Sequence, residues 1–240
     1  MNWGLVITFL FAAGCMIGWC LEFGYRNLIS HEGPRGRYFI NPGFCRGPWL
    51  PIYGIGLTVM FLITWFLTPD VGTVFVPLIL IGIGLSMTLI EFIGGFLLLH
   101  LLNMRLWDYR KFRGNILGFV CPQFSLIWTA LGALYYLFVH PLAIDGLIWL
   151  SHNLAFSFMI GLFCGLFIID FNLSNQDAMV IREFGEDEAV VIKYEELRQL
   201  IQEHRLQNAQ KARFFNQTSG GDSDLRMFLE KNRDRFDAKK

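Results

Sequence analysis

Three acidic side chains interrupt stretches of this chain that are otherwise apolar: Glu22, Glu91 and Asp170. An ionisable group within a membrane-spanning segment is costly, and it usually faces the interior of a helix bundle or a wet cavity. A carboxyl group held there can act as a general base. We therefore expect Glu91 to belong to a functional site with an arginine as its partner, the alternative being a structural ion pair or hydrogen bond that fixes the register of the helices. Glu22 is more simply structural, because Arg26 follows it by one helical turn.

Other polar side chains near the ends of the apolar stretches are expected to join Glu91 in one inward-facing pocket. Its candidate members are Glu91, Glu22, Arg26, Arg37, Asn41, Arg46, Tyr53, Asp108 and Asn115. No spacing of cysteine and histidine indicates a metal site, and no glycine-rich phosphate loop of the P-loop type is present. We expect neither a metal nor a cofactor.

Five apolar stretches must position these side chains: residues 3–24, 49–67, 74–99, 116–139 and 147–169. Each is long enough to cross the ~30 Å hydrocarbon layer as a helix. All 20 Lys and Arg residues fall in the first gap, in the third gap or after the last stretch. Because basic residues collect on the cytoplasmic side, the N-terminus is predicted outside and the C-terminus in the cytoplasm. The predicted fold is an all-α polytopic membrane protein with about five transmembrane helices.

The first gap is rich in residues that break helices. Residues 31–56 contain six glycines and four prolines. Such a sequence cannot form one regular helix, and irregular backbone at membrane depth must be buried in protein or line a cavity. We expect a structured cytoplasmic loop folded back against the bundle, in which residues 48–56 are either re-entrant or the beginning of the second span.

The division into domains follows the same change of composition. Residues 1–170 are predicted to form the membrane domain and residues 171–240 a small cytoplasmic α+β tail. Within the tail, the β-branched residues of 179–184 and 189–194 predict a hairpin. Helices are expected at residues 195–210 and 225–232, and residues 220–240 are expected to be dispensable.

Several motifs are similar to those of a known family. They are NPGFCRGPWLPIYGIG at residues 41–56, the downstream Glu91, and Trp107-Asp108-Tyr109 followed by Asn115, Gly118 and Cys121. Over about residues 1–170 the chain resembles bacterial membrane proteins of the putative ABC-transporter type IV, or ABC transporter permease, family. It departs from the family pattern at Pro42, Cys45 and Arg46. The resemblance implies a permease-like protein of the bacterial cytoplasmic membrane.

Two classes of function remain open. In the first, the chain is a transport component, surrounded by membrane lipids, that pairs with a separate ATPase subunit or forms a homo-oligomer. In the second, it is a membrane-embedded enzyme that acts on a lipid or lipid-linked substrate from the cytoplasmic face, with loop arginines clamping a phosphate. Whether it is an enzyme stays uncertain, because no catalytic motif is present. The net charge of zero gives no sign of a nucleic-acid partner.

Overall fold

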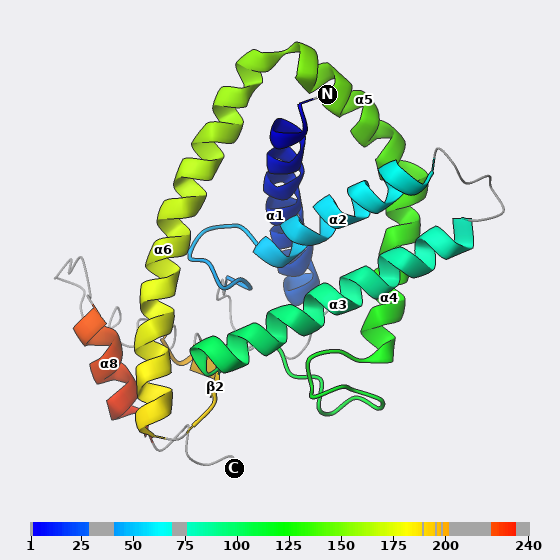
Figure 1. Cartoon of the computed structure of the whole chain (residues 1–240). Coiled ribbons are helices and arrows are strands. Elements are labelled where there is room, and N and C mark those ends of the chain that lie inside the picture. Colours follow the sequence, from blue (N-terminus) through cyan, green and yellow to red (C-terminus); the bar gives the residue numbers. More distant parts are fainter. Residues whose placement is uncertain are drawn as a thin grey trace.

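Long apolar helices make up most of the molecule in a computed structural model of the chain (Figure 1). The structure describes residues 2–28, 41–68, 76–188, 190–194, 196–197, 199–201 and 222–233. The main helices are α1 (Trp3–Leu28), α2 (Pro51–Leu67), α3 (Val76–Leu102), α4 (Pro122–Leu134), α5 (His140–His152), α6 (Ser157–Asp187) and α8 (Asp222–Lys231). A π-helical turn, η2 (Tyr135–Val139), joins α4 to α5, and a 3-10 turn, η3 (Leu154–Phe156), precedes α6.

Four helical stretches of the described chain are long and apolar enough to cross a bilayer, and α2, with 17 residues, is a shorter apolar helix. The prediction of an all-α polytopic membrane protein is therefore confirmed. In Figure 1, α4 and α5 form one arm and α6 the other arm of an inverted V, with α1, α2 and α3 between them. The N-terminus lies near the apex, and α8 lies at the opposite end.

The boundaries predicted for the last two spans are wrong. Helix begins at Pro122 rather than near residue 116, and it continues through the expected break at Asp145 to His152. Pro141 does not end the helix, although it lacks the N–H of an ordinary helical residue. The turn before it widens instead, and the His140 N–H donates to the Tyr135 carbonyl five residues back. The chain reverses at Asn153, and α6 follows.

Glycines set the closest contacts between helices. A Cβ on Gly14 would lie 2.7 Å from the Tyr53 carbonyl, and a Cβ on Gly18 would lie 2.2 Å from the Tyr53 ring. The pair Gly14 and Gly18 therefore brings α1 and α2 together, as small residues do between helices in lipid. Gly161 and Gly165 of α6 have the same spacing but open space beside them.

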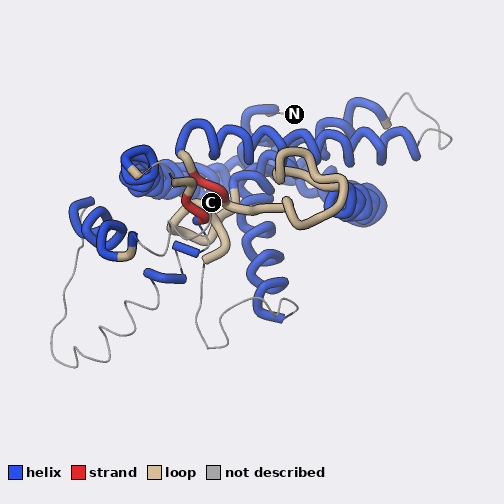
Figure 2. The backbone as a smooth tube through the Cα atoms, turned by 90° about the horizontal axis from the view of Figure 1, so that it is seen from below, coloured by secondary structure: helices blue, strands red, loops and turns tan. Residues whose placement is uncertain are grey.

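Two short strands, one after α3 and one after α6, pair with each other at the end of the bundle away from the N-terminus. Strand β1 (Met104–Arg105) follows α3 and pairs in parallel with β2 (Ile192–Lys193). Figure 2 shows these strands and the nearby loops on the end of the molecule seen from below. Met104 and Ile192 are fully buried there, in a core that also contains Phe184 and Leu229.

The predicted hairpin at residues 179–184 and 189–194 is wrong. The first of these segments lies within α6, which runs without interruption from Ser157 to Asp187. Ala178, Ile181 and Phe184 are buried at helical spacing, so packing outweighs the β preference of the branched residues. The helix expected near the C-terminus is present as α8, whereas most of the one expected at residues 195–210 lies outside the described residues. Because Leu229 of α8 is fully buried, the structure argues against a dispensable segment 220–240.

Candidate functional site

Glu91 lies on the buried face of α3, where its side chain is bonded by neutral donors. The residue is 5% exposed. Its Oε1 accepts a hydrogen bond of 2.8 Å from the Tyr109 hydroxyl, and its Oε2 accepts one of 3.1 Å from Trp128 Nε1. No Lys or Arg of the described chain forms an ion pair with it, so the predicted arginine partner is not found among these residues. Within the part of the chain that the structure describes, the carboxyl is therefore held by hydrogen bonds from uncharged groups.

A second carboxyl group, Glu22 of α1, lies nearby and is paired. Its Oε1 accepts a bond of 2.8 Å from Arg26 Nε, and its Oε2 accepts one of 3.3 Å from the Tyr53 hydroxyl. The Tyr53 ring also packs edge-on against the Trp128 ring, with 5.5 Å between the centroids. Tyr53 and Trp128 thus link Glu22 to Glu91. We call Glu22, Arg26, Tyr53, Glu91, Tyr109 and Trp128 the Glu22–Glu91 cluster.

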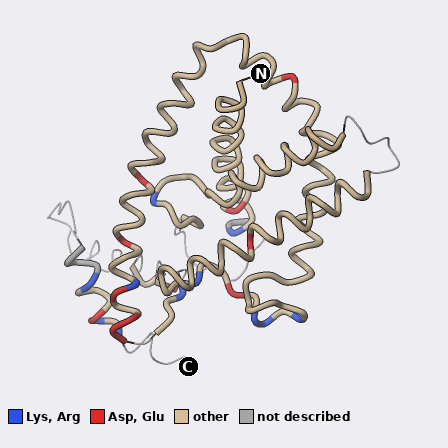
Figure 3. The backbone as a smooth tube through the Cα atoms, in the orientation of Figure 1, with Lys and Arg blue, Asp and Glu red and all other residues tan. Residues whose placement is uncertain are grey.

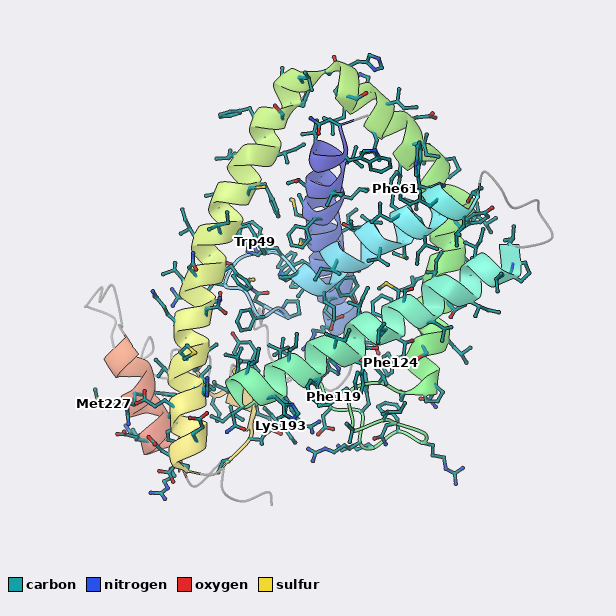
Figure 4. The ribbon with its side chains drawn as sticks, viewed as in Figure 1. Trp49, Phe61, Phe119, Phe124, Lys193 and Met227 are labelled. Carbon is teal, nitrogen blue, oxygen red and sulfur yellow. The ribbon has the colours of Figure 1, made fainter. Side chains whose placement is uncertain are left out.

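The α3–α4 loop, residues 103–121, positions Tyr109. The Tyr109 N–H donates to the Gly118 carbonyl at 2.9 Å, and the Asn115 Oδ1 accepts from the Gly118 N–H at 3.1 Å. Gly114 and Gly118 both have positive φ angles, which glycine adopts without strain. The Tyr109 ring stacks on Phe124 of α4, with centroids 4.5 Å apart, in the region where Figure 4 labels Phe124. Burial, and next the neighbouring Glu91 carboxylate, raise the pKa of Tyr109, so its hydroxyl keeps its proton.

Asp108 and Asn115 therefore contribute to the fold of this loop. Asp108 receives two bonds of 2.9 Å from Arg110 Nε and one of 2.6 Å from its Nη2. These bonds hold the pKa of Asp108 below its usual value. The Asn115 amide donates to the carbonyls of Arg110 and Phe112. Neither side chain bonds to Glu91.

Asn41 and Arg46 belong to a different structure, the irregular segment of residues 41–50. The Asn41 side chain donates to the carbonyls of residues 45, 46 and 47, and its Oδ1 accepts from Trp19 Nε1 at 2.9 Å. Arg46 forms two bonds with Asp177 of α6, at 2.7 and 2.9 Å. These bonds raise the pKa of Arg46. Since α2 begins at Pro51, only residues 51–56 of the ambiguous stretch 48–56 start the second apolar helix.

Asp170 ties the same segment to α6. Its Oδ2 accepts a bond of 2.7 Å from Trp49 Nε1 and one of 3.1 Å from the Gly47 N–H. The Trp49 ring packs edge-on against Phe163, 5.7 Å between centroids, and Figure 4 shows Trp49 between segment 41–50 and α6. On the other side, the Leu50 N–H donates to the Cys15 carbonyl of α1.

The structure thus gathers four of the nine predicted residues into one cluster: Glu22, Arg26, Tyr53 and Glu91. Arg37 lies outside the described residues. Sequence reasoning missed Tyr109 and Trp128 as partners of Glu91, although Tyr109 belongs to the Trp107-Asp108-Tyr109 motif. Trp128 carries no charge and stands in an apolar helix, so nothing local distinguishes it. No group of three metal-binding side chains occurs among residues of known placement.

Comparison with known proteins gives one match. No curated protein and no solved structure matches the chain. A family model described as Putative ABC-transporter type IV matches residues 9–175, which include every member of the Glu22–Glu91 cluster. The matched region also contains segment 41–50 and its contact with Asp170. By this match the chain belongs to the putative ABC-transporter type IV family.

Proposed function

We propose that this protein is the membrane-spanning, permease-like component of a bacterial transporter, and that its transport site includes the Glu22–Glu91 cluster. The observation that carries the proposal is the burial of Glu91 and the kind of group that bonds it. Its buried carboxyl is held in place by Tyr109 and Trp128, yet it has no cationic partner among the described residues. Intramembrane acids commonly mark substrate or proton pathways, and a carboxyl that is held by neutral donors is able to bind or release a proton or a cation.

The cluster is also assembled from side chains of several separate elements. Glu22, Tyr53, Glu91 and Trp128 come from four different helices, and Tyr109 comes from the α3–α4 loop. The Tyr53 hydroxyl reaches Glu22 over 3.3 Å, a longer bond than the 2.8 Å between Tyr109 and Glu91. A hydroxyl group donates and accepts, so it can follow a change in the charge of its partner without leaving it.

We place the protein in the cytoplasmic membrane with its N-terminus outside and residues 171–240 in the cytoplasm. Figure 3 supports this orientation, because the basic residues of the described chain gather in the half of the molecule away from the N-terminus. Helix α5 contains an acidic residue, Asp145, but acidic residues contribute little to membrane orientation.

Energy for transport would come from a separate subunit. The chain contains no phosphate-binding loop of the P-loop type, and the family description supports association with an ABC-type ATPase. A second copy of the chain is the other partner that we propose, since a small number of helices encloses little space for a substrate pathway.

The alternative, an enzyme acting on a lipid-linked substrate, requires an arginine to bind phosphate. Arg46 is an arginine of the first loop that the structure describes. Its guanidinium is already engaged by both carboxylate oxygens of Asp177, with Asp170 close by. A phosphate would have to displace the Asp177 carboxylate from this arginine, so we rank the enzyme second.

The test is purification from native membranes in lipid nanodiscs, followed by mass spectrometry of the bound proteins and lipids. We expect an ATPase subunit to co-purify, with ATP hydrolysis that depends on this chain. Glu91→Gln should lower that hydrolysis by about tenfold or more, as is usual when a buried group with a direct role is replaced. The complex should still assemble, because the glutamine carbonyl can accept the bond from Trp128 Nε1 while its amide N–H donates to the Tyr109 hydroxyl.

The matched control is Glu186→Gln, which changes an exposed carboxyl on α6. It should leave ATP hydrolysis unchanged. A bound lipid substrate without any ATPase would favour the enzyme instead. Normal ATP hydrolysis by the Glu91→Gln complex would assign Glu91 a structural role.

A further inference from the structure

The α3–α4 loop is a firmly built surface feature. Besides the bonds that position Tyr109, the Ile116 N–H donates to the Val120 carbonyl at 3.0 Å and the Phe119 N–H to the Ile116 carbonyl at 3.0 Å. Trp107 Nε1 donates to the Phe119 carbonyl at 2.9 Å, and the Phe119 ring is buried against Gly95 of α3. The loop therefore holds one conformation through its own hydrogen bonds and its buried aromatic side chain.

This conformation presents apolar side chains outward. Ile116 is 57% and Leu117 is 62% exposed, and they are adjacent in the chain. Leu117 adopts a φ of +53°, a left-handed conformation that costs a non-glycine residue roughly 1–2 kcal/mol. A loop that only had to turn the chain could use glycine at this position, as it does at Gly114 and Gly118. At Leu117 the loop therefore combines a strained backbone with a large, exposed apolar side chain.

Basic residues accompany the apolar pair. The loop contains Arg105, Arg110, Lys111 and Arg113 against one acidic residue, Asp108, which gives a net charge of +3. Arg110 is paired with Asp108, but Lys111 and Arg113 are exposed and form no ion pair with any described residue. The loop thus combines uncompensated positive charge with exposed apolar groups.

The position of the loop indicates which partner fits. It begins directly after α3 ends at Leu102, and it ends where α4 begins at Pro122. Both helices are candidate membrane spans, so the loop is held at the edge of the bilayer. At that depth, apolar side chains reach the acyl boundary, while Lys and Arg meet the negative charge of anionic headgroups.

We propose that the α3–α4 loop is a binding site for anionic phospholipid, in which Ile116 and Leu117 insert among the acyl chains and Lys111 and Arg113 bind the headgroup phosphate. Because Tyr109 is part of the same loop, a bound lipid would also fix the hydroxyl that bonds Glu91. The lipid site does not depend on the transport function proposed above.

The test places a photo-crosslinking amino acid, benzoyl-phenylalanine, at Leu117 of the full-length protein in its native membrane. We expect the irradiated protein to carry a phospholipid adduct, identified by mass spectrometry, in which anionic lipids are enriched over their share of the membrane. Replacing Lys111 and Arg113 with Gln should reduce that enrichment by about fivefold per residue, since each basic group near the membrane surface strengthens the binding of anionic lipid by about that factor.

The same crosslinker at Phe158, a residue 71% exposed on the apolar part of α6, is the matched control. It should also capture lipid, but its adducts should not change with the Lys111 and Arg113 substitutions. A protein adduct at Leu117 would show that this loop binds a partner subunit and would overturn the proposal. So would lipid adducts whose composition ignores both substitutions, or no adduct at Leu117 when Phe158 is labelled.

Discussion

Replacing Asp170 with alanine should detach segment 41–50 from α6. One oxygen of Asp170 accepts bonds from Trp49 Nε1 at 2.7 Å and from the Gly47 N–H at 3.1 Å. A hydrogen bond to a charged group contributes about 1.5–3 kcal/mol. Because Asp170 is only partly buried, we use the lower figure for each bond, which gives about 3 kcal/mol for the loss of both. Segment 41–50 should then open locally well before the whole protein unfolds.

Cys45 reports this opening, because it is fully buried within the segment. In a variant that retains only this cysteine, the rate of thiol labelling is proportional to the population of the open state. At 1.4 kcal/mol for each factor of ten, about 3 kcal/mol corresponds to labelling roughly 150-fold faster in Asp170→Ala. Asp170→Asn keeps an acceptor oxygen and loses only the charge, so its labelling should be faster by less than about tenfold.

The control is Asp177→Ala, which removes the ion pair with Arg46 one or two turns further along α6. The two side chains are 29% and 49% exposed, and pairs of this kind contribute only about 0.2–1 kcal/mol. Its labelling rate should rise by at most about fivefold. Equal rates in Asp170→Ala and Asp177→Ala, or a rate in Asp170→Ala like that of the parent, would refute the idea that Asp170 is the main attachment.

Three further outcomes are expected. Leu229→Ala should lower the free energy of unfolding by about 2–5 kcal/mol, because it leaves a cavity in the core. Met227→Ala, on the exposed side of α8, should have little effect. Thermal unfolding of the two variants in nanodiscs measures the difference. Gly18→Ala should destabilise the protein, because the new methyl group meets the Tyr53 ring between α1 and α2. Gly161→Ala should not, because nothing lies beside the new methyl group. Equal melting temperatures of the two variants would contradict this prediction. Arg110 lowers the pKa of Asp108, so their ion pair stabilises the loop at pH values above the ordinary aspartate pKa of about 3.9. This stabilisation is lost as the pH falls below that value and Asp108 is protonated. Protease resistance of the loop should therefore fall between pH 5 and pH 2 in the parent protein, and Asp108→Asn should abolish this pH dependence.

The membrane character of the chain could be predicted because hydropathy is a local property. Glu91 stands out for the same reason, as an acid within an apolar stretch of α3. Its partners could not be predicted, since they come from positions 18 and 37 residues away and carry no charge. Only the packing of α3 against α4 and the shape of the α3–α4 loop bring Tyr109 and Trp128 to the carboxyl.

The errors in helix boundaries have a related cause. His140, Pro141 and Asp145 are each unfavourable inside a membrane helix, so a break was expected between them. The π-turn at Tyr135–Val139 accommodates the proline, and the Tyr135 hydroxyl bonds His140 Nδ1 at 3.0 Å in a buried environment. The hairpin was predicted from residue type alone, whereas the register of Ala178, Ile181 and Phe184 already fitted a helix.

The sparse packing of α6 has a consequence for how the protein responds to its lipid. Within its most apolar window, only 6% of the residues are buried inside the protein, so most of this part of the helix is accessible to surrounding lipid. Its hydrogen bonds to segment 41–50 lie further along the helix, at Asp170, Ser174 and Asp177, and its buried residues Ala178, Ile181 and Phe184 follow. A helix longer than the local hydrocarbon thickness tilts to fit it. A change in bilayer thickness that tilts α6 would therefore be transmitted to segment 41–50 through these hydrogen bonds, so the packing of this segment should depend on membrane thickness.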